Sequence, residues 1–182
     1  MVKTIKVSAR PLAAGLVAAA AFGLPALAQL SAQGGPIRVN ADNSSVLERE
    51  RRVVVVGNVD IVQGDARLRA DTVTLYYSGT DSGGQTGIGG SFGDIESMTA
   101  EGEVFYVTPD LKARGDHGVY NALADTITLT GEVVLIRGED VARGNELVLN
   151  VSEGRSQLRG GDGRVQILIM PESDGTSPAP DN

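Results

Sequence analysis

The chain has 182 residues, of which 16 are basic and 23 acidic, giving a formal net charge of −7, and it contains no cysteine. Nucleic acid is disfavoured as a partner, because phosphate binding uses Lys and Arg to release counterions and the basic residues here are scattered among acids. The absence of cysteine excludes a disulfide framework and thiolate metal ligands. The single histidine, His117, excludes a metal site built on two histidines.

The segment 1–28 resembles a secretory signal peptide. Three basic residues precede an apolar stretch from Leu12 to Leu27, which ends in an Ala-Leu-Ala sequence at Ala28. A retained membrane anchor is the alternative, but the stretch is shorter than the ~20 apolar residues of a spanning helix, and Pro25 interrupts it. We therefore predict cleavage after Ala28 and export. The mature chain would carry 13 basic and 23 acidic residues, a net charge of −10.

A repeated frame occupies the middle of the chain. Three segments share it: Val53 to Leu75, Met98 to Tyr120 and Ile127 to Leu149. Each segment has the same interval between a glycine and a later Asp or Asn: Gly57 to Asp71, Gly102 to Asp116, and Gly131 to Asn145. The interval from Asp116 to Gly131 equals that from Asn145 to Gly160, which makes Gly160 the fourth glycine of the series. The unit is about 29 residues long, and internal repeats of this length are typical of stacked architectures.

The side chains within each unit alternate as β-strands require. Apolar residues stand two and four positions before and after each glycine, and again after the Asp or Asn. The row of apolar residues consists of Val55, Val59, Ile61, Leu75, Val104, Tyr106, Leu129, Val133, Leu135, Leu147 and Leu149. Strands with one continuous apolar face must stack to bury it. The sequence therefore predicts an all-β fold, an open and elongated β-jelly roll, across residues 29–170.

Two segments lack this alternation. Residues 78–93 hold seven glycines and lengthen the first interval between repeats, so we predict a loop inserted between strands. Residues 171–182 are rich in Pro, Ser, Gly and Asp, and we predict a disordered tail.

The repeated glycines, Gly57, Gly102, Gly131 and Gly160, have two interpretations. Each could supply the backbone freedom needed at a bulge or bend. Alternatively, because they share the register of the apolar row, their missing side chains could leave a groove between two sheets for an apolar ligand.

No catalytic residue, metal site or cofactor site is predicted. Acid pairs such as Glu101 with Glu103 could in principle form a glycosidase dyad. They recur, however, at turns and at positions that face solvent, which favours charged rims that keep strand edges from aggregating.

Three stretches resemble the OstA-like (LptA) family. They are P-I-R-V-N-A-D from Pro36 to Asp42, G-N-V-D-I-V-Q-G-D-A-R-L-R-A-D-T-V-T-L-Y-Y from Gly57 to Tyr77, and A-E-G-E-V-F-Y-V-T from Ala100 to Thr108. The resemblance covers about Pro36 to Met170, and the Gly-rich insertion departs from the short connection usual in the family.

This resemblance implies a periplasmic protein that bridges the inner and outer membranes and shields the acyl chains of lipopolysaccharide during transport. It also implies protomers joined end to end by strand addition, and partners with the same domain in the inner-membrane anchor and the outer-membrane translocon. The apolar row would then contact lipid. Two alternatives remain: a structural scaffold or adhesin-like module without lipid, and a polysaccharide-active β-solenoid enzyme, against which the lack of Trp argues.

Overall fold

The computed structural model describes residues 30–31, 34–78 and 94–170. The predicted signal peptide, the Gly-rich loop beyond Ser78 and the predicted tail lie outside the described residues. Within the described residues the secondary structure consists of ten strands and one short 3-10 helix, Glu48–Glu50. The strands are β1 (Ile37–Asn40), β2 (Asn43–Leu47), β3 (Arg52–Gln63), β4 (Ala66–Tyr77), β5 (Ile95–Val107), β6 (Lys112–Asn121), β7 (Thr126–Arg137), β8 (Asp140–Asn150), β9 (Arg155–Arg159) and β10 (Gln166–Leu168).

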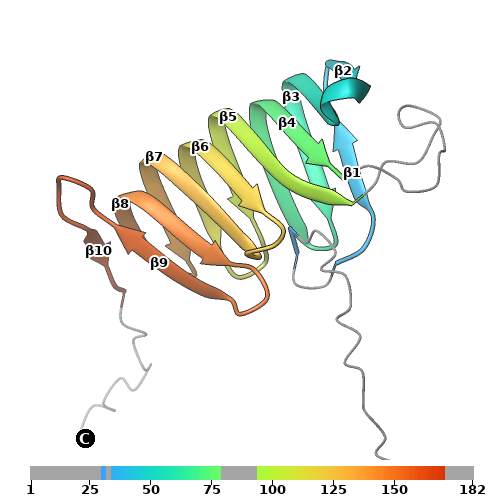
Figure 1. Cartoon of the computed structure of the whole chain (residues 1–182). Helices are drawn as coiled ribbons and strands as arrows, with labels where there is room; N and C mark the ends of the chain where they lie inside the picture. Colours follow the sequence, from blue (N-terminus) through green and yellow to red (C-terminus); the bar gives the residue numbers. More distant parts are fainter. Residues whose placement is uncertain (1–29, 32–33, 79–93, 171–182) are drawn as a thin grey trace, which may run out of the picture.

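The ten strands form a single antiparallel sheet in which each long strand pairs with the next along the chain. At one end, β1 and β2 both pair with β3, on different halves of that strand. At the other end, β10 pairs with residues 141–143 of β8, and β9 pairs with residues 146–150 of the same strand. The predicted all-β, open architecture is confirmed, and Figure 1 shows the strands stacked along one axis.

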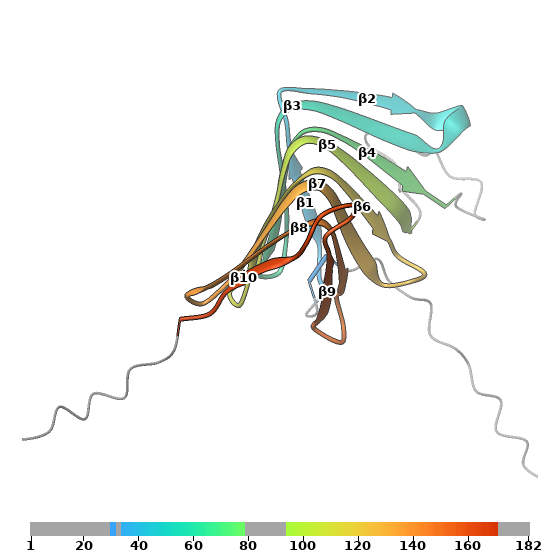
Figure 2. The same ribbon diagram turned by 90° about the vertical axis from the view of Figure 1, so that its left-hand side faces the viewer.

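Every long strand is interrupted near its middle, and these interruptions lie side by side. The ladders shift register between Val56 and Val59, and between Glu101 and Val104, for example. Because bulges bend a strand and increase its twist, their alignment folds the whole sheet lengthwise into a V, which is clear in Figure 2. The V has two leaves.

The first leaf contains β1, β10 and the half-strands 59–63, 66–70, 104–107, 112–115, 133–137 and 140–144. The second leaf contains β2, β9 and the remaining halves of β3 to β8.

A bulge also keeps the apolar side chains on the inner face of the sheet on both sides of the bend. In β4 the buried residues are Ala66, Leu68 and Ala70 before the bend but Val73 and Leu75 after it, so their parity changes at Asp71. Side chains alternate with a period of two, and one extra residue therefore keeps both halves turned inward. The two inner faces meet in one hydrophobic core.

The repeated glycines form the ridge of the V, where they carry positive φ angles: 85° at Gly57, 77° at Gly102 and 101° at Gly131. A side chain added at any of the three would collide with the carboxylate of Asp42, Asp71 and Asp116, respectively. The interpretation that missing side chains leave a ligand groove at these glycines is therefore wrong, because a carboxylate occupies that space.

Gly160 does not continue this series. Its φ lies outside the left-handed region, and an added side chain would meet the backbone of Gly163 and Arg164 in the turn before β10. Gly161, with φ of 59°, instead lies against Asn145. Sequence reasoning predicted Gly160 as the fourth glycine of the series where the structure has Gly161, because the sequence places the two glycines side by side.

Candidate functional site

The apolar row predicted from the sequence lies on the inner faces of the two leaves. Ten of its eleven residues are buried, and Leu135 is half-buried against the same core. Six belong to the first leaf: Val59, Ile61, Val104, Tyr106, Val133 and Leu135. Five belong to the second: Val55, Leu75, Leu129, Leu147 and Leu149. The fold thus brings residues from five long strands to one interior, which we call the trough.

Several further residues belong to the same interior. The predicted alternation already covers five of them, which were not included in the apolar row: Val73, Met98, Ala100, Tyr120 and Ile127. Sequence reasoning missed Ala66, Leu68, Ala70 and Ala113, because β4 and β6 change parity at Asp71 and Asp116. Leu30 also belongs to the core, although it lies outside every strand.

At the β1 and β2 end, the trough opens into an apolar cavity of about 400 Å³. The cavity lies where β1 and β2 diverge from β3 onto separate leaves. Its lining is apolar apart from Ser44 and the hydroxyl of Tyr77, and it consists of Ile37, Val39, Ser44, Val46, Val53, Val55, Leu75, Tyr77 and Ile95. Its volume falls within the about 300–1,000 Å³ typical of small-molecule sites.

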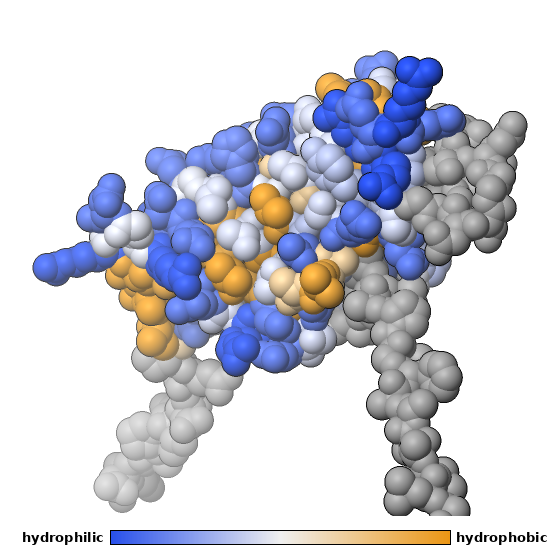
Figure 3. All heavy atoms as spheres, viewed as in Figure 1, coloured by the Kyte–Doolittle hydropathy of each residue, from blue (hydrophilic) through white to orange (hydrophobic). Residues whose placement is uncertain are grey.

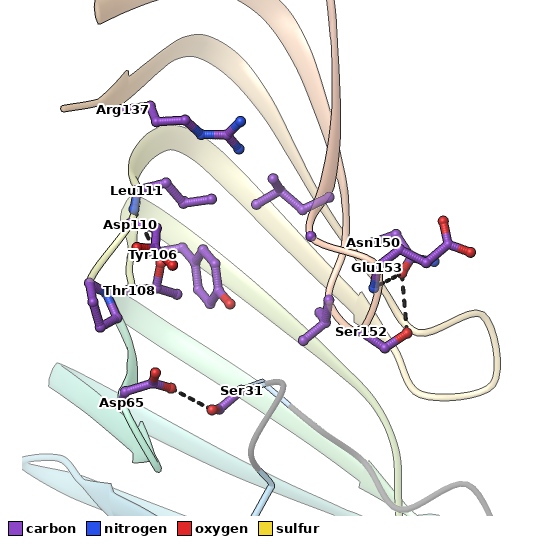
Figure 4. Close-up of a pocket in the computed structure, with 14 residues that line it drawn as sticks. Ser31, Asp65, Tyr106, Thr108, Asp110, Leu111, Arg137, Asn150, Ser152 and Glu153 are labelled. Atoms are coloured by element: carbon purple, nitrogen blue, oxygen red, sulfur yellow. Dashed lines mark hydrogen bonds between the residues drawn. The ribbon is translucent and has the colours of Figure 1, made fainter. Parts of the chain in front are cut away.

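A second, more polar cavity of about 490 Å³ lies between the turns of the two leaves. Turn residues of the first leaf, including Asp65 and Asp110, face residues 149–154 of the second (Figure 4). Tyr106 reaches this cavity from β5. Burial, reinforced by the charges of Asp65 and Asp125 and by Tyr120, raises the pKa of Tyr106 to about 12, so its hydroxyl remains a proton donor at neutral pH.

Between these openings the trough is closed. The space left around Leu30, Leu68, Met98 and Ile127 is about 10 Å³, which is hardly enough for one water molecule. The trough is therefore hollow at its openings and filled in its middle, with Leu30 as part of the filling.

Three further features of the described residues bear on function: metal-binding groups, membrane-spanning helices and the single histidine. Among them, no group of three or more His, Cys, Asp and Glu side chains is placed to hold a metal ion. None of their helices has the length and apolar character needed to cross a membrane. His117 is exposed on the outer face of β6, opposite Glu101 and Thr130.

Comparison with known proteins gives a consistent result. Residues 38–155 match the family described as the LptA/(LptD N-terminal domain) LPS transport protein. An uncharacterised protein of Rhizobium meliloti is 31% identical over 171 residues, covering 91% of this chain and 90% of that protein. The lipopolysaccharide export system protein LptH of Pseudomonas aeruginosa is 28% identical, covering 91% and 96%. Escherichia coli LptA is 25% identical, covering 88% and 83%.

The fold is shared with a solved structure. The crystal structure of Pseudomonas aeruginosa LptH, described as the LptA homologous periplasmic component of a lipopolysaccharide transport device, superimposes with a TM-score of 0.62. The match covers 75% of this chain and 96% of that one at 22% identity, which supports the fold alone. Because the family match covers residues 38–155 and a relative is 31% identical over most of the chain, this protein belongs to the LptA and LptD N-terminal domain family of lipopolysaccharide transport proteins.

Proposed function

We propose that the chain is a periplasmic carrier that holds acyl chains of lipopolysaccharide in its trough and shields them from water between the inner and outer membranes. The apolar cavity between β1 and β2 is the observation that carries this proposal. Acyl chains gain about 25 cal/mol for each Å² of apolar surface removed from water. Such a carrier needs an apolar hollow and no catalytic group.

The proposed periplasmic location rests on two supports. Residues 1–28 have the basic, apolar and small-residue regions of a signal peptide in order. The LptH structure is described as a periplasmic component, and the same location is proposed here for this chain.

End-to-end assembly is the proposed route across the periplasm. Each end of the sheet finishes in short strands, β1 and β2 at one end and β9 and β10 at the other, whose outer edges can accept a strand from a neighbour. An apolar patch of exposed residues covers β10 and the two residues after it, visible at the lower left of Figure 3: Ile167, Leu168, Ile169 and Met170.

Related domains are the proposed partners of this assembly. The LPS-assembly protein LptD of Salmonella choleraesuis is 29% identical over 94% of this chain, which corresponds to 18% of its own length. A domain of this kind at each membrane would let the same edge pairing continue from the inner-membrane anchor to the outer-membrane translocon.

A charge placed in the cavity tests the carrier function. Val39 lines the cavity and is 38% exposed, so Val39→Asp should leave the fold intact while making the cavity hostile to acyl chains. Val56→Asp is the matched control, because Val56 is 44% exposed on β3 and does not line the cavity.

Binding of purified lipopolysaccharide to delipidated protein, with circular dichroism to verify folding, gives the readout. We expect Val39→Asp to weaken binding roughly tenfold or more, as loss of one good apolar contact would, and Val56→Asp to leave it unchanged. A scaffold without a lipid ligand would bind nothing in any variant.

A further inference from the structure

Leu30 and Ser31 lie inside the trough, although they precede the first strand by several residues. Leu30 is 0% and Ser31 is 1% exposed. Around the Leu30 side chain stand Leu68 of the first leaf and Met98, Tyr120 and Ile127 of the second. Leu30 therefore fills the gap between the leaves in the middle of the molecule.

Polar side chains of the trough wall and of the adjoining turn hold this segment. The side-chain oxygen of Gln63 accepts a hydrogen bond from the Leu30 N–H, and the Tyr106 hydroxyl donates to the Leu30 carbonyl at 2.7 Å. The Gln63 amide also donates to the Gly35 carbonyl at 2.9 Å. The Ser31 hydroxyl donates to the Asp65 carboxylate at 2.5 Å, as Figure 4 shows.

Three of these four contacts are made to peptide backbone groups. Gln63 is 2% exposed on the inner side of β3, and a buried amide in an apolar wall is unfavourable unless its hydrogen bonds are made. Its oxygen and nitrogen bond to backbone groups of two residues on either side of positions 32–33. Tyr106, which keeps its proton, supplies the matching donor.

The segment is also held differently from the rest of the interior. Ladders of backbone hydrogen bonds join the long strands to one another. Leu30 and Ser31 are joined to the strands by the side chains of Gln63, Tyr106 and Asp65. The backbone bond from the Gly34 N–H to the Ser31 carbonyl, at 2.9 Å, stays within their own segment. Segments outside the strand ladders open at lower free energy than core strands, so we expect this one to leave before the V unfolds.

We infer that Gln63 and Tyr106 of the trough wall, with Asp65 of the adjoining turn, form a peptide-binding site, and that the chain's own Leu30 and Ser31 occupy it as a plug that an acyl chain must displace. This inference rests on the proposed function. The remaining space of about 10 Å³ beside Leu30 cannot admit a chain of methylene groups. A ligand that binds only the unplugged form has its apparent affinity reduced by the fraction of molecules that are unplugged.

A reversible crosslink tests the inference directly. A Cβ atom built at Gly64 lies 3.4 Å from the Ser31 Cβ, close to the about 3.5–4.5 Å found in disulfides. The chain has no other cysteine, so Ser31→Cys with Gly64→Cys can form only this bridge. The readout is the fluorescence of cis-parinaric acid, an 18-carbon acyl probe, titrated into the exported, delipidated protein before and after reduction.

We expect the oxidised protein to bind the probe at least roughly tenfold more weakly than the reduced protein, because the bridge removes the unplugged state. The two single cysteine variants control for the substitutions, and they should not respond to reductant. Equal binding in both redox states would overturn the plug while leaving the carrier function intact. Absence of binding by the wild-type protein and by both redox forms would instead overturn the carrier function, and the plug with it.

A second variant weakens the plug without any crosslink. Leu30→Ala removes most of the buried side chain, whereas Leu123→Ala trims a leucine that is 92% exposed and outside the trough. Leu30→Ala should bind the probe roughly tenfold more tightly than wild type, and Leu123→Ala should match wild type. Unchanged or weaker binding by Leu30→Ala would contradict the inference.

Discussion

Asp42, Asp71 and Asp116 lie along the ridge of the V, each against a glycine of the next long strand. The Asp116 carboxylate accepts a hydrogen bond from the Glu132 N–H at 3.1 Å, and the Asp42 carboxylate accepts one from the Asn58 side chain at 2.8 Å. Each carboxylate thereby occupies the bend that its glycine makes possible. The ridge depends on both members of the pair.

Gly131→Ala should therefore destabilise the protein by about 1–3 kcal/mol, the range for a side chain forced into a rare backbone conformation. The added methyl group would also collide with Asp116. Gly138→Ala is the control, because Gly138 also has a positive φ but nothing lies within 4 Å of its added Cβ. Urea unfolding should give a larger loss for Gly131→Ala, and equal losses would mean that the Asp116 contact is unimportant.

The raised pKa of Tyr106 predicts that the protein loses stability in alkaline solution. Its pKa is raised from 10.0 to about 12 by burial, with Asp65, Asp125 and Tyr120 adding to the effect. The unfolded chain releases this proton first, so the stability contributed by Tyr106 is complete below about pH 10 and is lost as pH rises towards 12. Tyr106→Phe removes this dependence.

The difference in unfolding free energy between wild type and Tyr106→Phe should accordingly shrink between pH 10 and 12. Denaturant titrations at several pH values measure it. A difference that stays constant over this interval would show that the hydroxyl titrates normally in the folded protein.

At the scale of the strands, alternation and glycine spacing were enough to predict a sheet with one apolar face. Every residue of the predicted apolar row lies in a strand on the inner side of the V. A bend at the repeated glycines was one of the two interpretations of the sequence, but the Asp residues of β4 and β6 shift the alternation by one position, so buried residues before them, such as Leu68 and Ala113, were missed. Leu30 could not be predicted, because a short segment before the first strand has no periodicity.

The edge strands carry a prediction about assembly. Lys side chains on an edge strand oppose pairing with another strand, so Ile167→Lys with Ile169→Lys should shift oligomers towards monomers. Leu123→Lys, in an exposed turn, is the control. Sedimentation velocity at matched concentrations gives the distribution, and unchanged oligomers in the double variant would exclude the β10 edge from the contact.

At the scale of the molecule, strand pairing gathers residues that look scattered in the sequence. The outer face of the first leaf gathers five basic residues: Arg67, Arg69, Lys112, Arg114 and Arg143. The same pairing collects the apolar row into a trough. Three of the basic residues, Arg69, Arg114 and Arg143, recur two positions before the Asp or Asn of each repeat. Sequence reasoning found the trough because it followed the apolar positions of the repeat, and it missed the basic residues because it did not follow the charged ones.

The central claim is that lipid lies between the leaves, and site-specific photocrosslinking tests it most directly. A benzophenone side chain placed at Val46, which lines the cavity, should crosslink to lipopolysaccharide added to the purified protein. The same group at Val56, which is exposed on β3 and does not line the cavity, should not. Crosslinking at Val56 with none at Val46 would contradict the account.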